Sequence, residues 1–98
     1  MINLKDIAEN IKNNNLDKAL DLCELFNDIN TQHIITNFKG VIYLIKGNLE
    51  LSEENLLKSL KINPKFEDAI KNLYLVYLKK TLLQFLVYLS LNTYNQYY

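Results

Sequence analysis

Glycine, proline, arginine and tryptophan are scarce or absent in this chain of 98 residues. It contains two glycines, one proline and no tryptophan, and all eleven of its basic residues are lysines. So few turn-forming residues leave little room for a sheet of short strands. Arginine is the side chain best suited to bidentate phosphate or guanine contacts. Because it is missing and the lysines are balanced by eleven acidic residues, we expect no nucleic-acid partner.

Cysteine and histidine each occur once. The single cysteine excludes an internal disulfide and fits a reducing compartment. The N-terminal residues lack the basic start and long apolar stretch of a secretory signal. These features favour a cytoplasmic protein.

The apolar residues recur at helical spacing along most of the chain. Short polar or turn-forming clusters interrupt this spacing four times, at Asn13–Asn15, Asn27–Asn30, Gly47–Asn48 and Asn63–Pro64. Pro64 lacks the backbone donor that a continuing helix needs, so it ends one segment and can open the next. The pattern predicts an all-α chain of antiparallel helices, the fifth of which runs from about residue 67 to 78.

A period of thirty-four residues is superimposed on this helical spacing. It relates Tyr43 to Tyr77 and Gly40 to Tyr74. Thirty-four residues is the length of one helix–turn–helix repeat, in which each hairpin buries its apolar face against the next. The period therefore predicts a stack of helical hairpins.

The stretch from Gly40 to Pro64 resembles the tetratricopeptide repeat family, because Gly40, Tyr43, Gly47 and Pro64 fall at that family's spacing. Ser52 stands where the family has a small alanine. The resemblance implies a right-handed superhelix of about two and a half repeats in one domain. Its parts would be repeat 1 (2–30), repeat 2 (33–66), a partial repeat 3 (67–80) and an apolar C-terminal helix (81–93).

The resemblance also implies a function, because the first helix of each hairpin in this family lines a concave groove that binds peptides. On this analogy the chain is a scaffold or adaptor that holds a peptide or helix of unknown identity. The residues expected in the groove are Lys5, Glu9, Lys12, Ile34, Asn37, Val41, Leu44, Ile45, Lys71, Leu75 and Leu78.

Few residues suggest catalysis. His33 has no histidine or cysteine partner nearby in sequence, and we interpret it as a helix-start or surface residue. Cys23 lies on an apolar stripe, where a free cysteine behaves as a small hydrophobe. Glu53 and Glu54 are adjacent and point about 100° apart on a helix, so they do not form an acid–base pair. We predict no enzyme activity, no cofactor and no metal site.

Residues 82–91 are apolar with only two polar interruptions, Gln84 and Ser90. The segment is too short to span a membrane, and a helix apolar on every side must be covered. We predict a homo-oligomer, most simply a two-fold dimer, in which this segment crosses to a neighbour. The predicted interface residues are Tyr74, Tyr77, Leu82, Phe85, Leu86 and Leu89.

Other roles for this segment stay open at this point. It can cap its own stack, or it can plug its own groove as an autoinhibitory element. Two alternatives to the adaptor function follow: a self-assembling structural protein whose groove is filled by its own or a neighbour's C-terminal helix, and a membrane-tethered adaptor.

Overall fold

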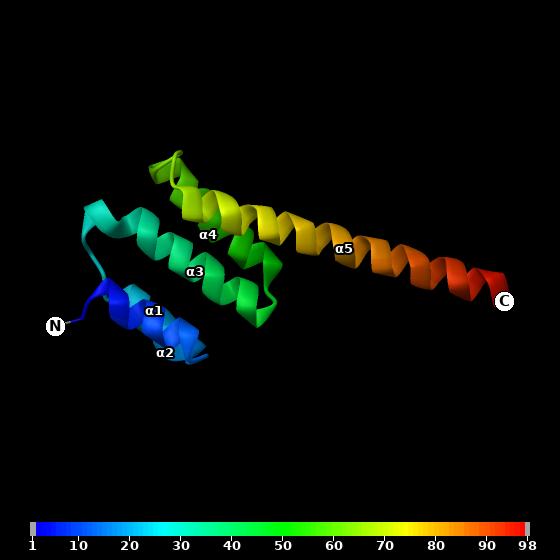
Figure 1. The fold of residues 1–98 in the computed structure, drawn as a ribbon, viewed down its shortest axis with the longest axis horizontal. Helices are drawn as coiled ribbons and strands as arrows, with labels where there is room; N and C mark the ends of the chain where they lie inside the picture. Colours follow the sequence, from blue (N-terminus) through cyan, green and yellow to red (C-terminus); the bar gives the residue numbers. More distant parts are fainter. Residues whose placement is uncertain (1, 98) are drawn as a thin grey trace.

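The computed structural model describes residues 2–97, which form five α-helices and one short 3₁₀ helix and contain no strand (Figure 1). The elements in chain order are α1 (Leu4–Lys12), α2 (Leu16–Glu24), η1 (Ile29–Thr31), α3 (Gln32–Lys46), α4 (Leu49–Ile62) and α5 (Glu67–Tyr97). The predicted all-α class is confirmed. The connections between the α-helices lie at or beside the four predicted turns.

Helices that are adjacent in sequence are also adjacent in space. α1 packs on α2, α3 on α4 and α4 on α5, while α3 also contacts α1, α2 and α5. Figure 1 shows the α1–α2 hairpin on one side of α3 and the α4–α5 pair on the other. The arrangement is thus a row of hairpin-like pairs with α3 in its middle.

Asparagines and a glycine determine where several of the helices begin and end. At α1, the Asn3 side chain accepts a hydrogen bond from the Asp6 N–H, and the Asp6 carboxylate accepts one from the Asn3 N–H, which is a capping box. Gly47 ends α3 with φ +84°, a left-handed conformation that costs glycine little. Asn48 then caps α4 by accepting from the Leu51 N–H.

Small residues let α3 and α4 approach closely. A Cβ placed on Gly40 would lie 2.5 Å from Cγ and Cδ2 of Leu56, a fully buried side chain. The buried hydroxyls of Ser52 and Ser59 each donate to a carbonyl of α3, those of Gly40 and His33 respectively, both at 2.6 Å. Seven residues separate the two serines and seven separate the two acceptors, as expected for antiparallel helices in register.

The core consists of two clusters that share α3. The first joins α1, α2 and α3, and its buried residues are Ile7, Ala19, Cys23, Ile35 and Ile42. The second joins α4 and α5, and its buried residues are Leu56, Ala69 and Val76, with Leu44 of α3 packed against them. The second cluster ends at Val76, so the rest of α5 contributes no buried side chain among residues whose exposure is described.

α5 differs from the sequence prediction. We expected a helix ending near residue 78 and a separate apolar helix over 81–93, but a single helix runs unbroken from Glu67 to Tyr97. No glycine, proline or asparagine lies between Tyr74 and Leu91, so nothing in this stretch stops the helix. Its second half projects away from the other helices, and the molecule measures 61 × 28 × 16 Å (Figure 1).

Candidate helix-binding cleft

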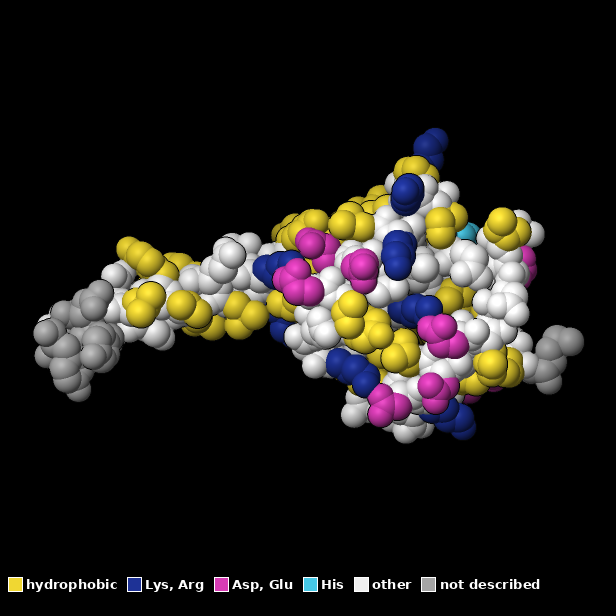
Figure 2. Space-filling view, turned by 180° about the vertical axis from the view of Figure 1, so that it is seen from behind, with side chains coloured by type: hydrophobic (Ala, Val, Ile, Leu, Met, Phe, Trp, Pro, Cys, Tyr) yellow, Lys and Arg dark blue, Asp and Glu magenta, His cyan; other side chains and the backbone are white. Residues whose placement is uncertain are grey.

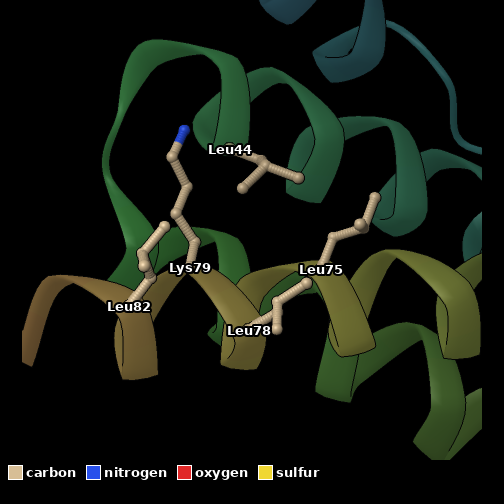
Figure 3. A pocket seen from close by; sticks show the side chains of 5 residues that line it. All are labelled: Leu44, Leu75, Leu78, Lys79 and Leu82. Atoms are coloured by element: carbon tan, nitrogen blue, oxygen red, sulfur yellow. The ribbon is translucent and has the colours of Figure 1, made fainter. Parts of the chain in front are cut away.

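A cleft lies between the C-terminal end of α3 and the middle of α5 (Figure 3). Its volume is about 320 Å³, and its lining residues are Leu44, Leu75, Leu78, Lys79 and Leu82. Figure 3 shows the Leu44 side chain reaching from α3 toward α5, while the Lys79 side chain extends from α5 toward the end of α3. The cleft is therefore a leucine-lined surface with one amine at its edge.

One helix end, one hydrogen bond and two ion pairs set the position of α5 beside α3 and α4. Gly47 ends α3 just beyond Leu44, so the cleft opens where α3 stops. Asn72 of α5 donates to the side-chain oxygen of Asn37 on α3 at 3.0 Å. Lys80 of α5 forms ion pairs with α4, at 3.0 Å to Glu50 and 3.5 Å to Glu53.

The charges near the cleft favour an anionic neighbour. Lys80 is engaged by α4, and its hydrogen bond to Glu50 raises the pKa of the Lys80 amine. In contrast, Lys79 and Lys71 form no ion pair with any residue in the described range 2–97. Both are exposed on α5. These two amines are available to carboxylates on a bound segment.

The structure brings together only some of the predicted groove residues. Leu44, Leu75 and Leu78 line the cleft, and Lys71 lies on α5 one turn before Leu75. Ile45 is half-exposed at the end of α3, whereas Ile34 and Val41 are partly buried on the same helix. Lys5, Glu9 and Lys12 are exposed on α1 and are not among the residues that line the cleft.

Asn37 corrects the groove prediction. Its side chain is 5% exposed and bonds to Asn72, so it joins α3 to α5 rather than facing an open groove. Burial of an amide is tolerated here because it has a partner. Neither Asn72 nor Lys79 was among the residues predicted from the sequence to lie at the groove. Asn72 could have been found from its position thirty-five residues after Asn37, one residue more than the repeat period.

Of the predicted interface residues, Leu82, Phe85, Leu86 and Leu89 are all exposed on one side of α5. Tyr77 differs, because at about 100° per residue it lies on another side of the helix, whereas Tyr74, eleven residues before Phe85, lies within about 20° of Phe85 around the helix axis. Tyr77 also has an intramolecular partner, since a hydrogen bond to the Glu53 carboxylate raises the pKa of its hydroxyl. We therefore separate Tyr77 from the leucine-rich side, and Tyr74 lies at the edge of that side.

The segment 81–93 neither caps its own hairpins nor plugs its own groove. Every side chain in this range is exposed, and the helix is continuous with the first half of α5. Figure 2 shows the apolar side chains of this segment standing clear of the body, where lysines and acidic residues are interspersed. An unbroken helix cannot turn back on itself, so the intramolecular plug is not the state seen here.

No family model, curated protein or solved structure matches this chain.

The single histidine and the single cysteine both pack against apolar side chains. The His33 ring packs edge-on against Phe66, with ring centroids 4.9 Å apart. Cys23 is buried in the first core cluster, and desolvation raises the pKa of its thiol to about 11. Within the described part of the chain, no three histidine, cysteine or acidic side chains gather as a metal site would require. In the same part, no helix combines the length and apolarity needed to cross a bilayer.

Proposed function

We propose that this protein is a non-enzymatic protein-interaction module that holds an amphipathic helix in the cleft between α3 and α5. The observation that carries the proposal is the cleft itself, whose lining is four leucines and the Lys79 side chain. An apolar strip between two helices suits the apolar face of a third helix, which presents side chains at spacings of three and four. A cytoplasmic location forms part of this proposal.

The resemblance to tetratricopeptide repeats supports the same conclusion. Helices that pack as sequential hairpins, with Gly40 and Ser52 at the close approach of α3 and α4, fit that architecture. We propose that the stack continues this right-handed superhelical pattern. The cleft would then belong to the concave side, where the first helices of successive hairpins, α3 and α5, lie next to each other.

The expected occupant is a helix with leucine-like residues along one face and acidic residues at its edge. The leucines of the cleft supply apolar contact, and each large side chain that it buries is worth about 1.5–3 kcal/mol before ordering costs. The amines of Lys71 and Lys79 would add attraction for carboxylates that weakens with salt. Apolar contact therefore sets most of the affinity, and the lysines set orientation.

A synthetic helical peptide of this design tests the proposal. We expect a fluorescein-labelled peptide with leucines at three- and four-residue spacing and glutamates at its edge to bind the protein, as measured by anisotropy. Leu44→Asp should abolish binding, because it places a charge at the floor of the cleft. Leu57→Asp is the matched control, since Leu57 is half-exposed on α4 and does not line the cleft. Equal binding by both variants would refute the proposed site.

Self-assembly is the second candidate function, and the projecting half of α5 favours it. In that case the protein is structural, and the helix that enters the cleft comes from another copy of the chain.

A further inference from the structure

The second half of α5, residues 82–97, is called the tail here, and it leaves a large area uncovered. A compact monomer of 11.5 kDa exposes roughly 5,800 Å², whereas this chain exposes 6994 Å². The excess of about 1,200 Å² exceeds the roughly 800 Å² that each partner contributes to a standard protein interface. The radius of gyration is 16.5 Å against about 12.6 Å for a compact domain of 98 residues. The tail thus supplies enough surface for a stable dimer.

A single stripe of side chains connects the cleft to the tail. Leu75, Leu78, Leu82, Phe85 and Leu89 follow one another at spacings of three, four, three and four. This is the repeat with which two helices pack side by side. The first three residues line the cleft and the last two stand exposed on the tail. The cleft and the tail are therefore two halves of one continuous packing surface.

The stripe is self-complementary about its central residue. Leu82 is the middle residue of α5, with fifteen residues on either side of it. In an antiparallel pair of α5 helices centred on Leu82, each tail of about 22 Å runs along the first half of the other α5. The pairs of facing residues in this register are Leu82 with Leu82, Leu75 with Leu89, Leu78 with Phe85 or Leu86, Lys71 with Thr93, and Asp68 with Gln96. Apolar residues meet in the centre, and polar residues meet at both ends.

We propose that the occupant of the cleft is the tail of a second copy of this chain, in a two-fold antiparallel dimer centred on Leu82. This inference rests on the proposed function and names its partner. Phe85 and Leu89 of one copy enter the cleft of the other, which is lined by Leu44, Leu75 and Leu78. Each cleft is completed only by the partner, and the same contact occurs twice, as an isologous interface requires.

The other sides of the tail fit this arrangement. Leu83 lies three helical turns after Asn72, so it is on the side of α5 that contacts α3. The two-fold axis is perpendicular to the plane that contains the two helix axes. The side of α5 that contacts α3 therefore points in the same direction in both copies. Leu83 therefore faces α3 of the second copy, where Ile45 is half-exposed, whereas Val87 follows Val76 by eleven residues and lies on the side of α5 that packs against α4. The remaining side of the tail carries Gln84 and Tyr88 and stays in contact with water.

The tail is compatible with the cleft in charge, although the amines of Lys71 and Lys79 would pair better with an acidic-edged helix. The segment 81–97 contains no charged residue, so docking it against the leucines of the cleft brings no unpaired charge from the tail into the interface. An acidic-edged helix remains able to compete for the same surface. The dimer should consequently be insensitive to salt, unlike complexes held by Lys71 and Lys79.

Disulfide trapping in the full-length chain tests the register. Leu82→Cys places two thiols opposite each other on the two-fold axis, so mild oxidation should give a covalent dimer. Leu89→Cys alone should not, because its partner in the other copy is Leu75. The double variant Leu75→Cys/Leu89→Cys should cross-link again. Tyr88→Cys is the control, since it faces away, and its covalent dimer should be at least about tenfold weaker than that of Leu82→Cys because distant thiols cannot bridge. Cys23 is buried and does not compete.

The other outcomes overturn the proposal in distinct ways. Cross-linking of Leu89→Cys as strong as that of Leu82→Cys indicates a parallel pair and refutes the antiparallel register. A wild-type chain that stays monomeric by light scattering, or that floats with phosphatidylcholine vesicles instead of dimerising, refutes the second copy as occupant. If such a monomer still binds the synthetic acidic-edged peptide, only this inference fails. If it does not, the proposed function fails as well.

Discussion

Replacing Gly40 with alanine should destabilise the protein, although alanine is the better helix former. The added Cβ would lie 2.5 Å from two atoms of Leu56, whereas carbon atoms pack best at about 3.5–4.0 Å. Leu56 is fully buried against α5 and cannot move aside freely. Overpacking of this kind costs about 1–3 kcal/mol. The higher helix propensity of alanine returns up to about 1 kcal/mol. We expect a net loss of about 1–2 kcal/mol in the free energy of unfolding.

Urea unfolding followed by circular dichroism at one fixed protein concentration measures this loss. A double-mutant cycle with Leu56→Ala supplies the control. Leu56→Ala alone should cost about 2–5 kcal/mol by leaving a cavity. In the double variant the new Cβ points into that cavity, so the two effects should be less than additive by about 1–2 kcal/mol. A Gly40→Ala variant that is more stable than the wild type would show that α3 and α4 do not approach as described.

Three further predictions concern the turn, the buried amide pair and the thiol. Gly47→Ala should cost about 1–2 kcal/mol because φ is +84°, and Asn14→Gly should be tolerated because φ is already +62°; both are measurable by thermal unfolding. Asn72→Ala should cost about 1–3 kcal/mol by leaving the Asn37 amide buried without its partner, and replacing both asparagines with leucine should cost less. The raised pKa of Cys23, about 11 against 9.0, means that the folded chain keeps a proton which the unfolded chain loses. Its contribution to stability is present below pH 9 and declines as the pH rises toward 11, and Cys23→Ala should flatten that decline in urea titrations.

The hairpin organisation could be predicted from the sequence because its signals are local. Gly47 and Asn48 stop and start helices through their own backbone and side-chain hydrogen bonds. Small residues at 40, 52 and 59 allow α3 and α4 to approach closely, because their short side chains leave room between the two helices. The serines add hydrogen bonds to α3 carbonyls, which explains why they can replace alanine in buried positions.

The course of α5 and the fate of Asn37 could not be predicted in the same way. The repeat pattern ends near residue 80, and we therefore expected a helix boundary there. Lys79, Lys80 and Thr81 include no glycine, proline or asparagine, so the helix continues through them. Asn37 has the spacing of a groove residue, yet its burial depends on Asn72, which reaches it only once α5 has docked. The burial of Asn37 arises from tertiary packing, which periodicity along one chain does not encode. The continuity of α5 instead follows from the absence of a helix-stopping residue, which the repeat boundary led us to overlook.

The two-fold dimer is tested most directly by the mass of the protein in solution, measured by light scattering for the wild type, Phe85→Asp and Tyr88→Asp. Phe85 lies on the stripe that enters the second copy's cleft, whereas Tyr88 lies outside that stripe, on the side of the tail that stays in contact with water in the proposed dimer. We expect the wild type and Tyr88→Asp to have a mass of about 23 kDa, twice the 11.5 kDa of one chain. Phe85→Asp should be a folded monomer. A wild-type mass of 11.5 kDa, or a Phe85→Asp variant that keeps the wild-type mass, would contradict the account.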